Sequence, residues 1–411
     1  MVRALEKNRA LIAGRAGANL EIRRVAVRDP LKVREGVHAP VTSDWREVVG
    51  DPAVDFVVEL MGGTTVAEEV ARAAIAADKP LITANKALLA ERGEGLFTEA
   101  EAHSVPIYFE ASVAGGVPIV KALREGLCAN HIRRIHGIVN GTCNYILSRM
   151  TEEGTGFAET LAEAKALGYA EADESLDVDG TDAGHKTAIL ASLAYGFHVP
   201  FSSVYVEGIR RVESIDVCMA NRLGYRIKLL ATIRADEHGA VEVRVHPTLI
   251  PLKHVLASVD GVFNAVLVEG DVVGPALFYG RGAGADPTAS AVLSDLIEAV
   301  GDRLRGGSRG LARHDLYGKL LPMEEVVTRY YLRMTVLNRP GTLAAVAAVF
   351  GSHAIGISSV FQPEDHDGET VPLVLLMDYA REKTVQQALD EVKALPSVQE
   401  PIRLIRVEDF S

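Results

Sequence analysis

The chain has 411 residues, of which 48% are hydrophobic and 24% are charged, and its formal net charge is −12. This composition is typical of a globular protein with two or three domains. The acidic balance argues against broad binding to nucleic acid or to an anionic membrane, because both need clustered Lys and Arg. No stretch approaches the ~18 apolar residues of a membrane helix. We therefore expect neither nucleic acid nor a membrane as a partner.

The cysteines and the N-terminus indicate the cellular compartment. Cys128, Cys143 and Cys218 form no CxxC pair and no Cys/His metal spacing. A sparse, odd set of this kind is typical of a reducing cytosol. The N-terminal segment is charged throughout and has no signal-peptide core. A cytoplasmic location is expected.

Helices and strands alternate regularly over residues 1–130, which predicts a dinucleotide-binding domain with a doubly wound (Rossmann-like) parallel α/β sheet. In chain order, the pattern predicts a helix over Met1–Arg15, strands over Leu20–Val27 and Val54–Leu60, a helix over Thr64–Ala77, a strand over Pro80–Thr83, a helix from Lys86, a strand over Ile107–Val113 and a helix from Pro118. A sheet of this kind should open with a strand and a glycine-rich turn. Because this chain opens with a helix, we expect its first strand and phosphate-binding turn to be missing.

The pattern changes after residue 130. Residues 131–320 are expected to form an α+β domain for substrate binding, catalysis and dimerisation, with helix 287–300 packing back on the first domain. Its predicted elements are a strand over Ile132–Val139, helices over Phe157–Leu167 and Ala183–Tyr195, and strands over Val241–Val245 and Val262–Glu269. A linker is expected around Gly306–Pro322. Residues 325–411 then follow a βαββαβ order, with strands Tyr330–Val336, Ile355–Phe361, Pro372–Met377 and Ile402–Val407 and helices Thr342–Phe350 and Glu382–Leu395.

The densest charge lies between Glu171 and Asp182, where six carboxylates fall within twelve residues, and Lys186 follows. On the predicted helix Asp182 and Lys186 are neighbours one turn apart. One interpretation is a solvated acidic loop with a surface ion pair worth about 0.3–0.5 kcal/mol. The other is functional, because the helix after Lys186 is apolar and a buried lysine beside carboxylates can deliver a proton. A calcium loop is excluded, since position twelve counted from Ser175 is Lys186 rather than Glu.

Three charged residues lie at or near predicted strand ends. Lys86 follows Pro80–Thr83, where doubly wound sheets bind ligands; the alternative is a solvated lysine at a helix start. Glu110 lies in an apolar strand, where an unpaired carboxylate is costly, so a buried salt bridge to Arg or Lys, a monovalent cation or a proton is expected. Arg28 follows the strand that reads the adenosine ribose. An arginine there favours NADP whereas the adjacent Asp29 favours NAD, so both cofactors stay open.

Other polar residues give weaker signals. The Gly62-Gly63 turn and the run Gly280–Gly284 are similar to phosphate-binding loops, although glycine clusters alone are weak evidence. His185 is expected to face solvent. Cys143 has no visible base partner and is interpreted as a packing residue.

Taken together, these segments resemble homoserine dehydrogenases in order and spacing over residues 1–320. The matching segments are Val58–Gly63, Thr83–Lys86, Glu110–Gly116, Val139–Thr142, Gly168–Glu171, Asp177–Lys186 and Phe278–Gly284. The tail, with Leu337-Asn338-Arg339-Pro340-Gly341-Thr342-Leu343, looks like an ACT domain, a small-molecule sensor.

The resemblance implies NAD(P)H-dependent, reversible reduction of L-aspartate 4-semialdehyde to L-homoserine in threonine, methionine and isoleucine biosynthesis. It makes Lys186 the general acid and places Lys86 near the cofactor and the reacting oxygen. Glu171 and Asp182 would hold the substrate's ammonium and hydroxyl groups, with Asp177 nearby. Further expected sites are the cofactor site at Arg28, Gly62, Gly63, Thr142, Gly168, Gly282 and Gly284, a sodium site at Glu110 and the carbonyls of Val113, Gly115 and Val117, and an effector site at Asn338, Gly341, Thr342 and Leu343.

Several alternatives stay open. The chain without its glycine turn could be catalytically impaired and work only as an amino-acid-binding ACT protein. A related oxidoreductase such as an aspartate-semialdehyde dehydrogenase is a lesser rival, because it needs a nucleophilic cysteine and Cys143 lacks the surroundings. The ACT-like tail would either mediate feedback inhibition by threonine, since its turn leads into a helix N-terminus, or serve assembly alone. Such modules pair edge to edge, so a homodimer or homotetramer is expected.

Overall fold

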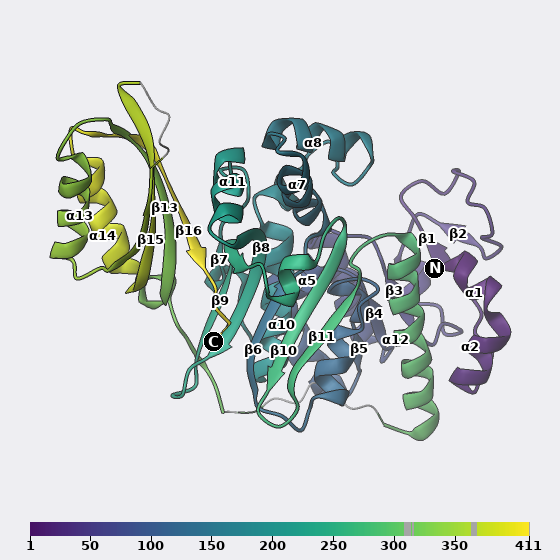
Figure 1. Cartoon of the computed structure of the whole chain (residues 1–411). Helices are drawn as coiled ribbons and strands as arrows, with labels where there is room; N and C mark the ends of the chain where they lie inside the picture. The colour runs from purple at the N-terminus through teal and green to yellow at the C-terminus, as the bar shows by residue number, and fades with distance from the viewer. Residues whose placement is uncertain (308–313, 315, 363–367, 411) are drawn as a thin grey trace. The chain divides into compact units, whose positions relative to one another are not determined.

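The computed structural model of the chain describes residues 1–307, 314, 316–362 and 368–410 (Figure 1). It divides into two compact units. The first unit comprises Met1–Gly141, Asp182–Val204 and Phe263–Gly318, and the second comprises Thr142–Thr181, Tyr205–Val262 and Lys319–Ser411. Residues 308–313 and 315 of the expected linker lie outside the described residues.

A parallel sheet of order β3-β4-β5 forms the centre of the first unit's N-terminal part. Its strands are β3 (Val57–Glu59), β4 (Leu81–Thr83) and β5 (Ile107–Tyr108), connected by helices α4 (Thr65–Ala76) and α5 (Lys86–His103). The three strands are largely buried, as expected for a sheet that helices cover. The predicted parallel α/β fold is confirmed.

The first unit contains further elements besides this sheet. They are α1 (Val2–Lys7), α2 (Arg9–Ala16), β1 (Val25–Ala26), β2 (Val41–Thr42), α3 (Arg46–Val49), η1 (Glu110–Ser112), α6 (Ile119–Lys121), η2 (Ala122–Gly126), β6 (Ile132–Ile138), α10 (Thr181–Tyr195), η3 (Phe201–Ser203), β10 (Phe263–Gly270), β11 (Gly274–Arg281) and α12 (Ala285–Arg305). Strand β10 pairs antiparallel with both β6 and β11. These three strands are therefore neighbours in a sheet other than β3-β4-β5.

Helix α12 packs against the parallel-sheet part of the first unit, although more than 170 residues separate it from β5 in the sequence. One buried cluster joins Val292 and Leu296 of α12 to Ile82 of β4 and Tyr108 of β5. A second cluster joins the same helix to the N-terminal helices α1 and α2, which lie beside it in Figure 1. The helix ends at Gly306, whose φ of 76° gives the left-handed cap that glycine adopts without strain.

The second unit combines helices with a large sheet. Its elements are α7 (Gly141–Glu153), α8 (Phe157–Ala166), α9 (Ser175–Val178), β7 (Tyr205–Val206), α11 (Ser214–Arg222), β8 (Tyr225–Ala235), β9 (Ala240–Pro251), η4 (Val255–Ser258), β12 (Lys319–Leu320), η5 (Met323–Glu325), β13 (Val327–Leu337), α13 (Thr342–Ser352), β14 (Ile357–Phe361), β15 (Thr370–Arg381), α14 (Glu382–Lys393) and β16 (Val398–Val407).

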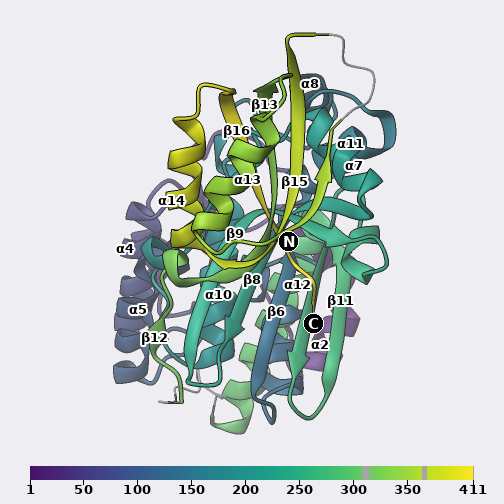
Figure 2. The ribbon, with the colours of Figure 1, turned by 60° about the vertical axis from the view of Figure 1, so that its left-hand side comes forward.

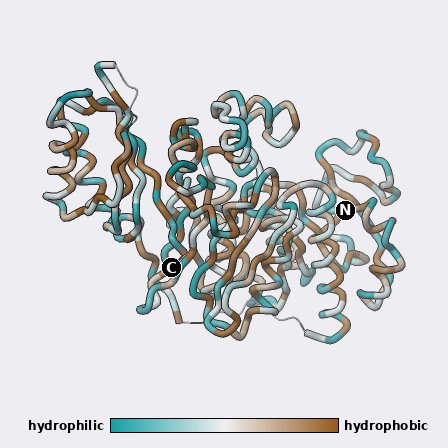
Figure 3. Tube along the Cα trace, in the orientation of Figure 1, coloured by the Kyte–Doolittle hydropathy of each residue, from teal (hydrophilic) through white to brown (hydrophobic). Residues whose placement is uncertain are grey.

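The C-terminal part of this unit has the predicted βαββαβ order and strand order β16-β13-β15-β14. Helices α13 and α14 cover one face of its sheet, as Figure 2 shows. Phe350 of α13 and Leu389 of α14 join Leu332 and Leu375 of the strands in one buried cluster. Figure 3 shows the matching hydrophobic stretches along these strands. Strand β16 also pairs in parallel with β9, which connects this part to the rest of the second unit.

Some predicted elements differ from the structure. The N-terminal helix is interrupted at Asn8, and the strand expected over Leu20–Val27 is reduced to β1, which pairs only with β2 among the described residues. A strand persists only where a neighbour accepts its hydrogen bonds, which explains the shortening. The strand expected to run through Val113 stops at Tyr108, and a 3₁₀ turn follows. Helices α7 and α11 were not predicted.

No helix among the described residues combines the length and the apolar character that crossing a membrane requires.

Candidate active site

A buried hydrogen-bond network fixes the carboxyl edge of the parallel sheet. The Glu59 side chain at the end of β3 accepts the Met61 N–H at 2.6 Å and the Thr83 hydroxyl at 2.6 Å. The Asn85 Nδ2 donates to the Gly63 carbonyl at 2.7 Å, and its Oδ1 caps α5 by accepting the Leu88 N–H at 3.1 Å. These contacts hold the turn after β3 and the start of α5 in fixed positions.

The turn itself leaves room for a ligand. Gly62 and Gly63 have φ values of 77° and 71°, are exposed, and have no atom within 4 Å of where a Cβ would stand. Dinucleotides bind at this edge of doubly wound sheets. The turn therefore fits a dinucleotide cofactor, and Lys86 begins α5 beside it.

Helix α10 brings the second lysine and a carboxylate to the same place. Its residues from Asp182 to Ala191 are all buried, and Asp182 and Lys186 are only 7% and 8% exposed. Lys186 Nζ donates to Asp182 Oδ2 at 2.7 Å and to the Val139 carbonyl at 2.7 Å. Lys86 Nζ lies 2.7 Å from Asp182 Oδ1. One carboxylate thus contacts both predicted catalytic lysines.

Asn140 completes this cluster. Its Nδ2 donates to Asp182 Oδ2 at 2.9 Å, and both residues are buried. The sequence identified the Asn140-Gly141-Thr142 motif but gave Asn140 no role. The available signal was its position directly after the apolar strand β6. Neither Asn140 nor the Val139 carbonyl was predicted as part of the site.

The electrostatics of the cluster follow from its burial. Burial alone would raise the pKa of Asp182, but the charges and hydrogen bonds of Lys186 and Lys86 hold that pKa well below its ordinary value. The carboxylate therefore stays ionised at physiological pH between two cations. The interpretation of Asp182 and Lys186 as a surface ion pair is wrong, because both side chains are buried.

His185 differs from the prediction. We expected it to face solvent, but it is buried with its ring 4.3 Å from the Phe201 ring and its Nε2 3.5 Å from Glu91 Oε1. Burial is the main cause that lowers its pKa. All faces of α10 near Lys186 are covered, so the neighbouring histidine is covered as well.

The other predicted substrate residues belong to the second unit. Glu171 is exposed, and Asp177 is half-buried in the short helix α9. The Asp177 carbonyl accepts the Cys143 thiol at 3.2 Å, so Cys143 is buried beneath the acidic loop. Thr142 Oγ1 donates to the Tyr169 carbonyl at 2.7 Å, which ties the start of α7 to the turn after Gly168.

The expected sodium loop meets the second glycine turn within the first unit. Gly116 N–H donates to the Arg281 carbonyl at 3.0 Å. A Cβ on Gly115, whose φ is 47°, would stand 2.5 Å from the Gly282 carbonyl oxygen. Only glycine allows this close approach. The two turns of residues 113–117 and 280–284 are therefore adjacent in the structure, which the sequence analysis did not predict.

Glu110 lies beneath this loop in η1 rather than in a strand. Its carboxylate accepts the N–H groups of Val120 and Lys121 at 3.1 and 2.8 Å. Burial raises its pKa despite these hydrogen bonds and the nearby charges of Lys121 and Arg124. Two main-chain N–H groups thus bind the Glu110 carboxylate, for which the sequence had predicted other partners.

Asp295 of α12 is adjacent to this group. It is 1% exposed, and its Oδ2 accepts the Glu110 N–H at 2.8 Å. Burial raises the pKa of Asp295 to about 7, although Lys121, whose Nζ lies 3.5 Å away, acts in the opposite direction. No sequence pattern singles out this residue.

Two further predicted sites consist of other residues than the lysine cluster. Arg28 is exposed just after β1, and the adjacent Asp29 carboxylate accepts the Leu31 N–H at 3.0 Å. In the second unit, all four predicted effector residues line one pocket at the start of α13. That pocket is lined by Val336, Leu337, Asn338, Arg339, Pro340, Gly341, Thr342, Leu343, Gln362 and Leu373.

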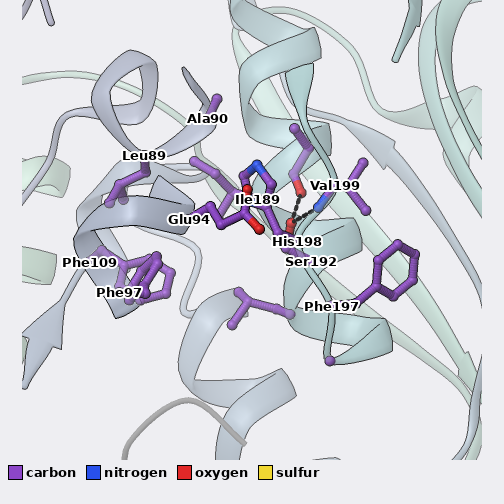
Figure 4. Close-up of a pocket in the computed structure, with 13 residues that line it drawn as sticks. Leu89, Ala90, Glu94, Phe97, Phe109, Ile189, Ser192, Phe197, His198 and Val199 are labelled. Carbon is purple, nitrogen blue, oxygen red and sulfur yellow. Dashed lines mark hydrogen bonds between the residues drawn. The ribbon is translucent and has the colours of Figure 1, made fainter. Parts of the chain in front are cut away.

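Helices α5 and α10 also enclose an apolar pocket that contains none of the cluster's side chains (Figure 4). Leu89 and Phe97 of α5 face Ile189 of α10 across it. The Ser192 hydroxyl beside it is satisfied, since it accepts the Val199 N–H and donates to the Ala188 carbonyl. Glu94 and His198 also line the pocket, and its other lining residues are mostly apolar.

Three family models match the chain. Residues 1–110 match "Homoserine dehydrogenase, NAD binding domain", residues 118–297 match "Homoserine dehydrogenase", and residues 332–400 match "AHAS small subunit-like ACT domain". Together the first two matches cover most of the first 300 residues.

Curated relatives and solved structures agree with these models. Homoserine dehydrogenase of Pseudomonas aeruginosa is 44% identical over 99% of this chain and 95% of its own length, and that of Neisseria gonorrhoeae is also 44% identical with the same coverage. The crystal structure of a homoserine dehydrogenase from Thiobacillus denitrificans has a TM-score of 0.95 at 44% identity, covering 100% of this chain and 95% of that one. A hyperthermophilic archaeal homoserine dehydrogenase in complex with NADPH has a TM-score of 0.56 at 29% identity, covering 65% and 76%.

Proposed function

The chain belongs to the homoserine dehydrogenase family of NAD(P)-dependent oxidoreductases, and we propose that Lys86, Asp182 and Lys186 form its catalytic centre. The alternative of an impaired chain that works only through its ACT-type domain finds no support, since the similarity extends over 99% of the chain. The observation that carries the proposal is the single buried carboxylate in contact with both lysines.

The substrate fits this charge arrangement. L-Homoserine carries an ammonium group, a carboxylate and a hydroxyl, and oxidation of the hydroxyl carbon gives L-aspartate 4-semialdehyde. When bound, NAD(P) accepts the hydride in this direction and supplies it in the other. Two lysines around one carboxylate leave a net charge of +1 in the cluster. That charge stabilises the oxyanion character that develops on the substrate oxygen during reduction.

Lys186 is the general acid in reduction. An ammonium group has three N–H donors, and those of Lys186 are directed to Asp182 and to the Val139 carbonyl in the contacts described. The third donor is therefore assigned to the substrate oxygen, to which it transfers a proton as the carbon gains hydride. In oxidation the neutral amine takes that proton back. Lys86 lies on the opposite carboxylate oxygen, where we place it beside the cofactor and the same substrate oxygen.

Asp182 orients the two lysines and is the substrate-side anchor of the cluster. Its two oxygens accept three donors, from Lys86, Lys186 and Asn140, and a carboxylate offers about four lone-pair sites. One site stays for a donor group of the substrate. We assign the ammonium group to Glu171, with Asp177 nearby, because an exposed carboxylate can exchange water for a cation at little cost.

The experiment that tests this function is homoserine-dependent reduction of NAD and NADP by the chain. We expect reduced cofactor to appear only when L-homoserine is present, and the reverse reaction to consume it with L-aspartate 4-semialdehyde. A folded chain that reduces neither cofactor would overturn the proposal. Comparing the rates with NAD and with NADP also decides which cofactor the chain prefers, a question that the adjacent Arg28 and Asp29 do not settle. We propose NADP, which a 2′-phosphate contact with Arg28 would favour.

We also propose that Glu110 and the carbonyls of Val113, Gly115 and Val117 hold a sodium ion. Among the described residues no group of three or more His, Cys, Asp or Glu is placed to bind a metal, so carbonyl oxygens would supply most of the ligands. The support is the turn at Ala114 and Gly115, where two successive positive φ values of 53° and 47° fold the main chain back. Thermal unfolding in sodium and in choline chloride tests this site, and equal midpoints would remove it.

The C-terminal domain is proposed to bind threonine and to assemble the chain. The support for the effector is the pocket that gathers Asn338, Gly341, Thr342 and Leu343. The support for a homodimer or homotetramer is β14, which is the outermost strand of its sheet and is mostly exposed. Light scattering on the intact chain tests the assembly, and a monomer would exclude it.

A cytoplasmic location is proposed from the cysteines. The chain has three cysteines without a CxxC pair, a usage typical of a reducing compartment. Fractionation of the source cells followed by an activity assay tests the location, and activity outside the cytoplasmic fraction would contradict it.

A further inference from the structure

A buried arginine of the last strand connects the ACT-type sheet to the rest of the second unit. Arg406 of β16 is 3% exposed. It pairs with Tyr330 of β13 inside the ACT-type sheet and, on the other side, lies in register with Thr248 of β9. One strand, and this one residue of it, therefore takes part in both pairings.

The guanidinium of Arg406 bridges two carboxylates. It donates to both oxygens of Glu382, the first residue of α14, at 3.1 and 2.5 Å. Its Nη1 donates to Glu207 Oε2 at 2.5 Å, and its Nη2 donates to the Tyr205 hydroxyl at 3.1 Å. Planar guanidinium groups hold carboxylates in a fixed geometry that lysine cannot reproduce. Arg406 of the C-terminal strand thereby holds the Glu207 side chain in place.

Residues directly after Glu207 hold the acidic loop. We define the acidic segment as residues 174–180, which include Asp177. Ile209 N–H donates to the Val178 carbonyl at 2.8 Å. A Cβ on Gly208 would stand 2.1 Å from that same oxygen, so the two chain segments are in the closest contact that glycine permits.

Arg210 adds charged contacts to the same segment. Its Nε donates to Asp179 Oδ1 at 2.5 Å and its Nη1 donates to Glu174 Oε1 at 3.0 Å. Main-chain and side-chain contacts of residues 208–210 therefore both end on the acidic segment. Its position depends on where residues 207–210 lie.

We propose that Arg406, although it belongs to the C-terminal strand, is a positioning residue for the substrate-binding acidic segment. This inference rests on the proposed function, in which Asp177 lies beside the substrate's ammonium group. The path runs from Glu382 through Arg406 to Glu207, and from residues 208–210 to the acidic segment. It provides a physical connection through which events at the ACT-type domain affect substrate affinity.

The effect should appear in substrate affinity and not in the chemical step. Without Arg406, Glu207 loses its cation, and because its side chain is 30% exposed it can turn to solvent. Residues 205–207 keep their main-chain pairing with β9, but residues 208–210 lose the side-chain anchor of Glu207, and the acidic segment loosens. The lysine cluster keeps its own contacts, since Lys86, Asp182 and Lys186 bond to one another and to residues 139–140.

The test compares Arg406→Met with Arg333→Met as the matched control. Arg333 lies on the neighbouring strand β13, is also buried, and pairs with Asp216 and Glu213 instead of Glu207. Both variants lose a buried arginine from the same sheet, so general destabilisation affects both. The measurements are the KM for L-homoserine, the KM for the cofactor, kcat, and hydrogen exchange of residues 174–180.

We expect Arg406→Met to raise the KM for homoserine by about tenfold, with kcat and the cofactor KM changed less than about threefold. Hydrogen exchange of the acidic segment should become faster, and Arg406→Lys should restore part of the affinity. Arg333→Met should change neither the homoserine KM nor this exchange. A folded Arg406→Met with the homoserine KM and exchange of Arg333→Met would overturn the inference.

Two further outcomes are decided in the same experiment. If Arg406→Met does not fold, Glu207→Ala breaks the same link at a partly exposed carboxylate, and unchanged homoserine KM and exchange in that variant would overturn the inference. If the unmodified chain does not turn over homoserine, the proposed function fails. Hydrogen exchange of residues 174–180 in Glu207→Ala then still decides whether the link exists.

Discussion

Lys186 Nζ lies 2.7 Å from Asp182 Oδ2, one helical turn away on α10, and both residues are more than nine-tenths buried. Taking two charges out of water costs several kcal/mol per ion, and only good geometry with further hydrogen bonds offsets that cost. Lys86, Asn140 and the Val139 carbonyl supply those bonds. A pair held at such cost at the edge of a parallel sheet is better explained by catalysis than by stability.

Replacing Asp182 by Asn should disable the cluster without removing its shape. The neutral amide leaves two lysine charges without their shared counterion, so the lysines repel each other and lose their orientation. We expect kcat to fall by about a hundredfold with the cofactor dissociation constant little changed. Steady-state kinetics and cofactor titration measure both quantities, and a kcat within threefold of the unmodified chain would exclude an orienting role.

Asp295 should make the stability of the first unit depend on pH. Burial raises its pKa to about 7 in the folded state, against roughly 3.9 in the unfolded chain. The folded state therefore keeps a proton that the unfolded state releases. The stability that this group contributes is fully present below about pH 4 and is lost as pH rises through 7, a change on the order of 4 kcal/mol.

Asp295→Asn removes that titration while its amide oxygen can still accept the Glu110 N–H. We measure the free energy of unfolding in urea at pH 5 and at pH 8. The stability of the variant relative to the unmodified chain should be greater at pH 8 than at pH 5. Asp302→Asn, on the same helix α12, is the control and should show no such gain. An equal pH dependence in the unmodified chain and in Asp295→Asn would show that Asp295 is ionised when folded.

Arg28 should set the cofactor preference. Its exposed guanidinium follows β1, where it can pair with a 2′-phosphate and make charge-assisted hydrogen bonds. Arg28→Ala should lower kcat/KM for NADP by about tenfold and leave that for NAD within about twofold. Arg34→Ala, which removes a half-buried arginine that donates to the Asp29 and Lys32 carbonyls of the same loop, is the control. Equal losses with both cofactors would assign Arg28 to general folding of the loop.

The ACT-type pocket should respond to an amino acid. We expect L-threonine to inhibit homoserine oxidation, and Asn338→Ala to raise the half-inhibitory concentration by about tenfold through the loss of one hydrogen bond. Ser352→Ala, at the opposite end of α13, should leave inhibition unchanged. A flat response of the unmodified chain to threonine would leave the domain with the role in assembly alone.

The sequence was informative where local patterns decide the structure. Regular alternation predicted β3, α4, β4 and α5, and the helical spacing of Asp182 and Lys186 correctly paired them. The sequence could not predict that Lys86 also contacts the Asp182 carboxylate. A contact between residues 96 positions apart depends on how the sheet and α10 pack.

The same limit explains the residues that were missed. Asn140 looks like any polar residue after a strand until Asp182 is placed beside it. Asp295 reads as an ordinary acid on an amphipathic helix, and only the packing of α12 against η1 buries it. Strand β1 was instead predicted too long. An apolar run forms a strand only where a neighbouring strand accepts and donates its hydrogen bonds.

The most direct test of the catalytic centre is the turnover of Lys186→Met compared with Lys228→Met. Lys228 is also a buried lysine that donates to a main-chain carbonyl and a carboxylate, those of Val259 and Asp260, so it controls for the loss of a buried charge. We predict that Lys186→Met lowers kcat for homoserine oxidation by about 10²–10⁴-fold and still binds the cofactor, whereas folded Lys228→Met keeps its turnover. Near-normal turnover by folded Lys186→Met would contradict the assignment of the general acid.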